Sequence, residues 1–294
     1  MWRRATESLA VVCLLGAGID APRQAPPSFR GVANAVPLYV TVTDAEGRAV
    51  SGLTRDEFEI LEDGRARDVA VFAAAHQPVA ATLLLDMNGP PVEVPWLRDA
   101  ATAFVNALAP DDRVRLGTFG DEIFLSPRLT GDRAYLQWVL RDELWAAASS
   151  PLWNAVDAAL AADGEPADRR TIVLLTNGYH APPRRLDGRV GARDVLDRAE
   201  ATGTAVFVVT FEAVTLDRRL QLLADRTGGR LTTIQDLSFA PEVFAGIVSD
   251  LHTQYLLGFV PARIDGDTHE IEVRVTRPGA TVRSRTRYRT VRTP

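Results

Sequence analysis

The pattern of apolar and polar positions along the chain changes twice, near residue 78 and near residue 253. Before the first change, apolar and polar side chains alternate, as in VPLYVTVTD, where Leu38, Val40 and Val42 share one face. The segments DEFEILEDG and RDVAVFAA continue this alternation after turn-forming residues. Residues 36–77 therefore predict antiparallel strands and no helix.

Residues 78–252 alternate between apolar strands and amphipathic helices. AATLLLD, TIVLLT and TAVFVVTF are continuous apolar runs, which are typical of strands buried on both faces of a parallel sheet. Between them, apolar residues recur at helical spacing, for example from Leu97 to Leu108. RVRLGTF and EIFLSPRL flank a Gly-Asp pair and predict one antiparallel hairpin. This order predicts an α/β domain with a doubly wound, mostly parallel sheet.

Residues 253–291 return to the β pattern in QYLLGFVPA, HEIEVRVTR and ATVRSRTRYRTV. A lone three-stranded sheet is only marginally stable, so neither flank is expected to fold by itself. Together, residues 36–77 and 253–291 supply about six strands. We predict that they pair into one small antiparallel β domain, into which the α/β domain is inserted.

The last β segment carries Arg283, Arg285, Arg287 and Arg289 at every second position. In a continuous strand these side chains would lie on one face. Such a row predicts either contact with an anionic surface or like charges that protect an exposed sheet edge from aggregation.

The N-terminal segment has the features of an export signal. Two arginines precede the apolar stretch Leu9–Ile19, which is far shorter than the roughly 20 residues of a membrane span. Residues 1–21 are therefore predicted to be a signal peptide and residues 22–35 a linker, so the protein is expected in the periplasm or outside the cell. Cys13, the only cysteine of the 294 residues, lies in this segment, so the mature chain is expected to have no disulfide and no thiol chemistry.

Composition and motifs argue against several classes of enzyme. All 33 basic residues are arginine, which excludes Schiff-base lysines and a P-loop lysine. No Gly-x-Gly-x-x-Gly follows a strand, and no Gly-x-Ser-x-Gly motif is present. Asp111 and Asp112 are expected to form a solvated turn. The histidines are scattered over different segments without the spacing of metal ligands, at His76, His180, His252 and His269.

A binding site is expected beyond the carboxyl ends of the central strands, where strand order reverses in a doubly wound sheet. The strand in LLLDMNGPP ends at Asp86, and the strand in VLLTNG ends at a Thr-Asn pair. A third loop, AAASSPLWNAV, has Ser149 and Ser150 directly before Pro151. Proline is favoured at the first position of a helix, which predicts Ser150 as its N-cap.

These three loops resemble those of a von Willebrand factor type A domain, as shown by LLLDMNGP, SSPLWNAVDAAL and TIVLLTNG. The flanks, from VTVTDAEGRAVSG to EIEVRVTRPGATVRSRTRY, are similar to those of the bacterial variant called VWFA-related, particularly in acidobacteria. The resemblance covers roughly residues 36–290. It implies a Rossmann-like sheet, an adhesion function and a metal-ion-dependent adhesion site. In that site, an Asp-x-Ser-x-Ser loop, a threonine and an aspartate hold Mg²⁺, which takes a carboxylate from a partner protein.

Only part of the metal-binding motif that the resemblance implies is present in this chain. Asp86 matches the first aspartate and Ser150 matches the threonine. Asn88, Pro90 and Asn177 replace the first serine, the second serine and the third-loop aspartate. Mg²⁺ requires nearly octahedral oxygen ligands, so we expect no metal cofactor, with Asp86 and Ser150 as the residual ligands if Mg²⁺ binds. Both replacing asparagines precede glycine, so deamidation would return carboxylates to those positions.

The resulting hypothesis is an exported, non-enzymatic module that binds another protein without metal. The surface that it would use consists of residues 86–91, 149–153 and 177–183, called the loop face below, and Trp145 is a candidate aromatic anchor beside it. Neither a nucleic-acid partner nor a transmembrane anchor in the mature chain is expected. The candidate binding residues are Asp86, Asn88, Ser149, Ser150 and Asn177.

Two alternatives remain open at the level of sequence. The first is weak Mg²⁺- or Mn²⁺-dependent adhesion through Asp86 and Ser150. The second is a degenerate hydrolase of the cell envelope that uses Asp86 or His180 as its base.

Overall fold

The computed structural model describes residues 35–74, 76–162, 169–184, 188–211 and 217–290. The predicted signal peptide, nearly all of the predicted linker and Cys13 lie outside these described residues. Within the described part of the chain, none of the helices combines the length and the apolar character that crossing a membrane requires.

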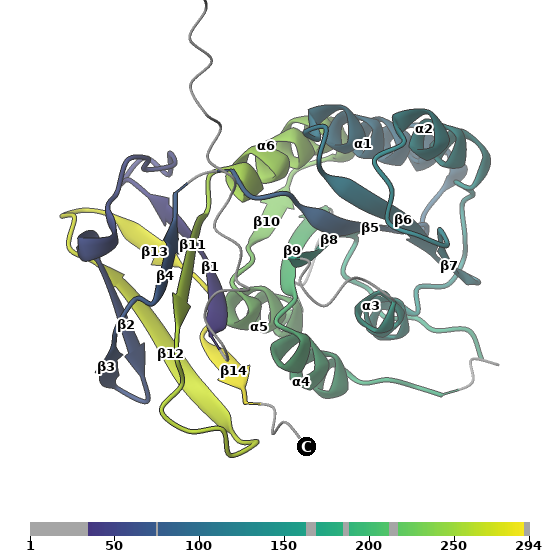
Figure 1. The fold of residues 1–294 in the computed structure, drawn as a ribbon. Helices are drawn as coiled ribbons and strands as arrows, with labels where there is room; N and C mark the ends of the chain where they lie inside the picture. The colour runs from purple at the N-terminus through teal and green to yellow at the C-terminus, as the bar shows by residue number, and fades with distance from the viewer. Residues whose placement is uncertain (1–34, 75, 163–168, 185–187, 212–216, 291–294) are drawn as a thin grey trace, which may run out of the picture.

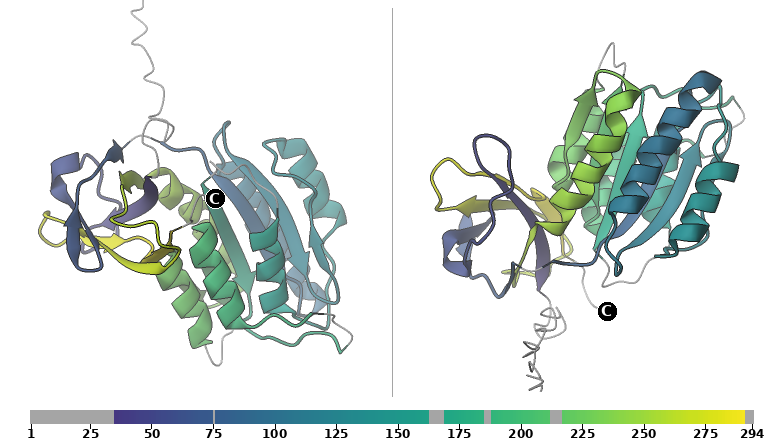
Figure 2. Two further views of the ribbon diagram at one scale, coloured as in Figure 1. Left: turned by 60° about the horizontal axis from the view of Figure 1, so that its bottom comes forward. Right: turned by 90° about the horizontal axis from the view of Figure 1, so that it is seen from above.

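A six-stranded sheet forms the centre of the α/β domain (Figures 1 and 2). Its strand order is β10-β9-β8-β5-β6-β7, and every pairing is parallel except that of β7 with β6. The doubly wound, mostly parallel sheet and its edge hairpin are thus confirmed. The strands are β5 (Ala80–Asp86), β6 (Arg113–Phe119), β7 (Ile123–Leu125), β8 (Arg170–Thr176), β9 (Ala205–Phe211) and β10 (Leu231–Ile234).

Helices cover both faces of this sheet and produce two hydrophobic cores. One core lies under α1 (Val94–Ala107), α2 (Arg133–Asp142) and α6 (Ala240–His252). The other lies under α3 (Leu152–Ala161), α4 (Ala192–Thr202) and α5 (Arg218–Thr227). Every residue of β5 is buried because both of its faces are covered, which explains its uninterrupted apolar sequence.

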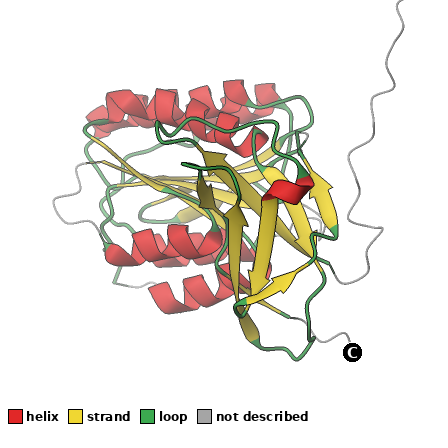
Figure 3. Ribbon diagram, turned by 90° about the vertical axis from the view of Figure 1, so that its left-hand side faces the viewer, coloured by secondary structure: helices red, strands yellow, loops and turns green. Residues whose placement is uncertain are grey.

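The second domain consists of two four-stranded antiparallel sheets, with strand orders β13-β1-β11-β4 and β14-β12-β2-β3 (Figure 3). Strands from before and after the α/β domain pair in both sheets: Leu38 lies opposite Leu257, and Ile60 lies opposite Val273. These four side chains belong to a third core, shared by the two sheets. The strands are β1 (Val36–Thr43), β2 (Phe58–Glu62), β3 (Arg65–Arg67), β4 (Val71–Ala73), β11 (Tyr255–Phe259), β12 (Thr268–Val275), β13 (Thr281–Arg283) and β14 (Arg287–Arg289).

The prediction of a one-sided row of arginines was wrong. Arg283 ends β13 and Arg287 begins β14, and these two strands belong to different sheets. Between them the chain crosses from one sheet to the other, with Ser284 buried. Arg285 turns back against the protein, where its Nη2 donates to the carbonyl of Pro37 at 2.6 Å. The single row of arginines therefore ends at this crossing between the two sheets.

The two domains contact each other where the end of α5 meets the crossing between β13 and β14. Gly228 ends α5 in the left-handed conformation, with φ of 80°. A β-carbon at this glycine would lie 2.5 Å from the backbone nitrogen of Arg285, so only glycine allows this approach. The backbone N–H of Thr286 donates to the carbonyl of Arg226 at 3.1 Å. This contact fixes the α/β domain against the β domain.

Candidate functional site

Asp86 is the last residue of β5, at the point where strand order reverses. The chain continues from β5 to its neighbour β6 on one side, whereas the later strand β8 pairs with the other side of β5. Loops leave such a point in opposite directions and open a space beyond the sheet. Asp86 lies at this point of the sheet and is 1% exposed.

Three donors from three segments hold the Asp86 carboxylate. Thr176 Oγ1 donates to Oδ2 at 2.6 Å, and Ser150 Oγ donates to the same oxygen at 3.0 Å. The backbone N–H of Asn88 donates to Oδ1 at 3.1 Å. Thr176 reaches Asp86 because the parallel register of β5 and β8 places Leu85 beside Leu175, one residue earlier in each strand.

Burial raises the pKa of Asp86 to about 7, although hydrogen bonds from Thr176, Asn88 and Ser150 act in the opposite direction. A carboxylate removed from water favours its neutral form unless charged partners compensate. The donors around Asp86 are hydroxyls and an amide, so none of them carries a positive charge. Asp86 therefore titrates near neutral pH.

Backbone pairing joins the loop face to the neighbouring segments. Ser150 and Ala181 exchange two N–H···O hydrogen bonds of 2.8 Å each, which connects the second and third loops. The N–H of Ala147 donates to the carbonyl of Met87 at 2.7 Å, which connects the first loop to the segment before Ser149. A β-carbon at Gly120 would lie 2.3 Å from Cβ of Ala147, so this glycine allows the close approach of the loop after β6. The three loops are thus held as one surface.

The two asparagines that replace motif residues contact each other. Asn177 Nδ2 donates to the backbone carbonyl of Asn88 at 2.9 Å and to its side-chain Oδ1 at 3.0 Å. Asn177 Oδ1 in turn accepts the N–H of Tyr179 at 3.1 Å. An aspartate at position 177 would have no N–H to donate, so this connection depends on the amide.

The structure brings four of the five candidate residues into one hydrogen-bonded network, consisting of Asp86, Asn88, Ser150 and Asn177. Ser149 lies beside the network and is partly exposed. Sequence reasoning missed Thr176 as a member; its hydroxyl at a strand end, directly before Asn177, was the available signal.

The prediction that Ser150 caps α3 was wrong. Pro151 is the N-cap residue, and α3 begins at Leu152. The Ser150 hydroxyl lies within hydrogen-bond distance of both the Asp86 carboxylate and the carbonyl of Tyr179, at 2.9 Å from the latter. Pairing with Ala181 turns Ser150 towards the sheet edge, away from the helix N-terminus.

Large apolar side chains are exposed on or beside the loop face. Val92 is 72% exposed, Trp145 is 72% exposed and Tyr179 is 57% exposed. Tyr179 lies within the third loop, Val92 follows the first and Trp145 precedes the second, and we call these three residues the apolar rim. Trp153, in contrast, is 1% exposed and belongs to the core under α3.

The oxygen donors at this site do not match the ligand set that Mg²⁺ prefers. Asp86 is the carboxylate of the hydrogen-bonded network, and both of its oxygens accept hydrogen bonds, while the Glu93 carboxylate lies beside Gly89 in the first loop. Pro90 offers no side-chain oxygen, and Asn88 Oδ1 accepts a bond from Asn177. Mg²⁺ requires nearly octahedral oxygen coordination and gives up its water reluctantly, so a single engaged carboxylate provides little compensation.

The two candidate bases of the hydrolase alternative, Asp86 and His180, have different surroundings. The hydrogen-bond partners of the Asp86 side chain among the described residues are Thr176, Ser150 and Asn88, and no histidine is among them. Partial burial, followed by the charges of Arg219 and Arg189, lowers the pKa of His180.

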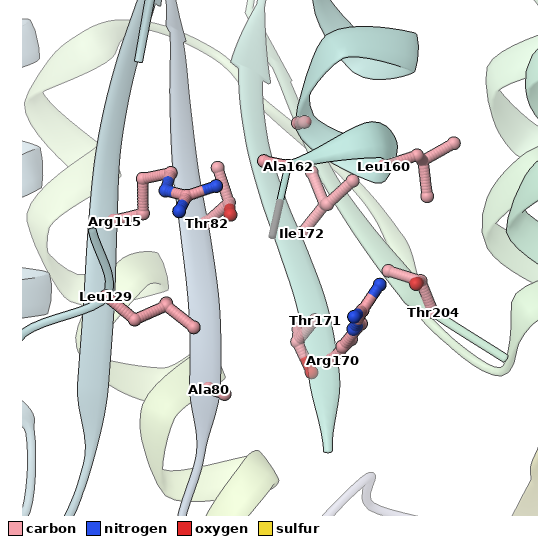
Figure 4. A pocket seen from close by; sticks show the side chains of 11 residues that line it. Ala80, Thr82, Arg115, Leu129, Leu160, Ala162, Arg170, Thr171, Ile172 and Thr204 are labelled. Atoms are coloured by element: carbon pink, nitrogen blue, oxygen red, sulfur yellow. The ribbon is translucent and has the colours of Figure 1, made fainter. Parts of the chain in front are cut away.

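A small cavity lies near the amino ends of the central strands, whereas Asp86 lies at the carboxyl end of β5 (Figure 4). Its lining includes Ala80 and Arg170, the first residues of β5 and β8, together with Arg115 and Thr171. Its volume of about 20 Å³ provides room for roughly one water molecule. This cavity is too small for an organic substrate.

Two further expectations from the sequence were wrong. Asp112 does not lie in a solvated turn, because it is 1% exposed and accepts the backbone N–H groups of Val79 and Ala109 at 2.8 and 2.7 Å. The histidines are not all scattered either, since the rings of His76 and His252 are 4.5 Å apart between centroids. Their spacing of 176 positions hides this contact in the sequence.

Comparison with known proteins gives a likeness in fold. No protein-family model and no curated protein matches the chain. A von Willebrand factor type A protein from Catenulispora acidiphila is similar in structure, with a TM-score of 0.52 and 11% identity over 88% of this chain and 74% of that one. Proximal thread matrix protein 1 from the mussel byssus has a TM-score of 0.51 and 10% identity over 61% of this chain and 49% of that one.

The class of domain follows from the sheet order, the place of Asp86 and these likenesses. The α/β domain has the fold of a von Willebrand factor type A domain, and the first similar structure matches across most of this chain. The resemblance that the three loop sequences carry is thereby confirmed at the level of fold.

Proposed function

We propose that the protein is an exported, non-enzymatic interaction module that binds another protein through the loop face and the apolar rim. The observation that supports this most is the backbone pairing that holds three loops together, with Trp145, Tyr179 and Val92 exposed within these loops or next to them in the sequence. Preorganised loops lose little conformational entropy on binding, and exposed aromatic side chains commonly provide most of the energy of an interface.

We further propose that this binding needs no metal ion. Support comes from the hydrogen bonds that occupy the Asp86 carboxylate and from the contact between Asn88 and Asn177. In this proposal Asp86 connects the loops by accepting hydrogen bonds, and the partner contacts the apolar rim. A partner carboxylate coordinated through Mg²⁺ has no part in it.

Replacing two rim residues should abolish capture of the partner. The immobilised mature chain is compared with the Trp145→Ala/Tyr179→Ala variant for proteins retained from the culture fluid and envelope of the producing cell. Each substitution is expected to weaken binding about ten-fold, as for aromatic residues at the centre of an interface. Titration of the captured protein against both chains measures this loss.

The matched control is Val260→Ala/Ile264→Ala, which removes two exposed apolar side chains of the β domain, 48% and 42% exposed. This variant should bind like the wild type. Equal capture by the rim variant and the wild type would contradict the proposal. A further arm adds EDTA and then returns either Mg²⁺ or Zn²⁺; binding that is lost with EDTA and recovered with Mg²⁺ alone would favour metal-dependent adhesion instead.

Restoring the missing ligands should create a Mg²⁺ site that the wild-type chain lacks. The variant Asn88→Ser/Pro90→Ser/Asn177→Asp returns two hydroxyls and one carboxylate to the positions of the motif. Because ligand number and charge determine affinity for Mg²⁺, calorimetric titration should detect saturable binding in the variant and none in the wild type. Intact-mass measurement of the wild type beforehand excludes deamidation of Asn88 and Asn177.

The same variant with Asp86→Ala is the control, because it keeps the new groups and removes the original carboxylate. It should lose the restored binding. Saturable Mg²⁺ binding by the unmodified wild type would contradict the metal-free proposal directly.

A further inference from the structure

We propose that His76, Asp112 and His252 form a binding site for a divalent transition metal ion of the Zn²⁺ class, located where the chain passes between the two domains. Each residue offers one ligand atom, and the three atoms all lie within 4.8 Å of one another. Two imidazoles with one carboxylate are a donor set suited to Zn²⁺ and not to Mg²⁺ or Ca²⁺.

The three residues reach this place from distant parts of the chain. His76 lies in the connection from β4 to β5, where the chain enters the α/β domain. His252 is the last residue of α6, just before the chain returns to β11. Asp112 precedes β6 and also accepts the N–H of Val79, three residues after His76. A metal ion held by this set would join the two crossings between the domains (Figure 1).

The geometry requires only small movements to receive an ion. Nε2 of His252 lies 2.7 Å from Oδ2 of Asp112, which is a hydrogen-bond distance. Two atoms that ligate the same Zn²⁺ tetrahedrally, at about 2.0 to 2.2 Å each, are about 3.4 Å apart. These two atoms must therefore move slightly apart to admit the ion, and the most widely spaced pair of ligand atoms in the set must move closer together.

The surroundings provide support for one ligand and access for the ion. Nε2 of His76 lies 3.1 Å from Oδ1 of Asp111, and such carboxylate contacts orient histidines beside a metal. The side chain of His76 is 38% exposed and that of His252 is 21% exposed, whereas that of Asp112 is fully buried. The ion would thus enter from the His76 side, with solvent at its remaining position.

Neighbouring contacts hold this part of the structure in place without the ion. Arg169 Nη1 donates to the carbonyl of Leu251 at 2.7 Å, and its Nη2 bonds to Oε1 of Gln254. Gln254 Nε2 then donates to Thr41 Oγ1 in β1 at 2.7 Å. The site therefore lies on a preformed connection between the domains, which lowers the cost of organising the ligands.

The test is calorimetric titration of the full, tag-free chain with Zn²⁺, repeated for His76→Ala and for His252→Ala. The wild type should bind one equivalent saturably, and each variant should bind at least about ten-fold more weakly. Thermal unfolding should show a rise in Tm with Zn²⁺ and none with Mg²⁺, because only an ion that binds the folded state stabilises it.

His269→Ala is the matched control, because His269 also contacts two carboxylates, Asp63 at 2.7 Å and Asp265 at 3.1 Å, but has no second histidine among these contacts. It should bind Zn²⁺ like the wild type. Absence of saturable binding, or undiminished binding by His76→Ala, would overturn the proposal. His76 is partly exposed, so its removal tests the site even if His252→Ala does not fold. None of these outcomes depends on the rim residues, so the proposal stands or falls separately from the proposed function.

Discussion

The Asp86→Asn variant is expected to be more stable than the wild type at pH 8, by as much as about 4 kcal/mol, and nearly equal to it at pH 4. The buried carboxylate has a pKa of about 7 in the folded protein, compared with 3.8 for an ordinary aspartate. Between these values the folded state holds a proton that the unfolded state has released. The contribution of Asp86 to wild-type stability therefore falls as pH rises from about 4 to about 7 and is level above that.

Asparagine resembles the protonated form of Asp86 and cannot ionise. Its Oδ1 can still accept the N–H of Asn88, and its Nδ2 would lie beside the hydroxyl oxygens of Thr176 and Ser150. Urea denaturation of both proteins at intervals from pH 4 to pH 8 measures the difference. The pKa of His269 is raised chiefly by its hydrogen bond to Asp63, so its titration also lowers stability as pH rises. Both proteins contain His269, so this effect cancels in the difference between them.

Asp86→Ala provides the control for this experiment. It removes the ionisation and also leaves three donors without their acceptor, so it should destabilise the protein at pH 4, where Asp86→Asn does not. If the stability difference between the wild type and Asp86→Asn does not change between pH 4 and pH 8, the pKa of the Asp86 carboxylate in the folded protein lies outside this range.

The second large effect is expected at the contact between the domains. Gly228→Ala should destabilise the protein by about 3 kcal/mol, from left-handed backbone strain together with overpacking. The added β-carbon would lie 2.5 Å from the nitrogen of Arg285 and 2.8 Å from the carbonyl carbon of Ser284, and backbone atoms cannot move aside as a flexible side chain can. Chemical denaturation gives the change in the free energy of unfolding.

Gly279→Ala separates the two contributions. Gly279 also has a positive φ, of 75°, but nothing lies within 4 Å of the added carbon. This control should cost only the backbone strain, about 1 kcal/mol. Equal losses for the two variants would mean that the β13–β14 crossing yields to the new atom and that the contact is not rigid.

The sequence predicted the parts of the fold that depend on local pattern. The mostly apolar sequence AATLLLD makes β5 recognisable as a central strand that ends at Asp86, and all seven of its residues are buried in the structure. The position of the loop face at the reversal of strand order could be inferred from that alone. These features required no knowledge of contacts between distant segments.

The remaining features depend on such contacts. The direction of the Ser150 hydroxyl is determined by pairing with Ala181, and nothing in a Ser-Ser-Pro sequence indicates that partner. His76 and His252 come together because the β domain is interrupted and the chain must enter and leave the α/β domain at neighbouring points. The row of arginines failed as a prediction because the chain leaves one sheet after Arg283 and joins the other at Arg287, and the alternating sequence does not indicate this crossing.

The insertion of one domain into the other has a mechanical consequence. The described chain begins next to β1 and ends next to β14, so both of its ends leave from the β domain. A pulling force between these ends would pass from β1 to β13 through their pairing, in which Thr41 lies opposite Arg283, and then along the crossing to β14. The α/β domain contacts this path where the crossing meets the end of α5, whereas the loop face does not belong to it. The loop face would keep its shape under tension until the pairing of β1 with β13 yields.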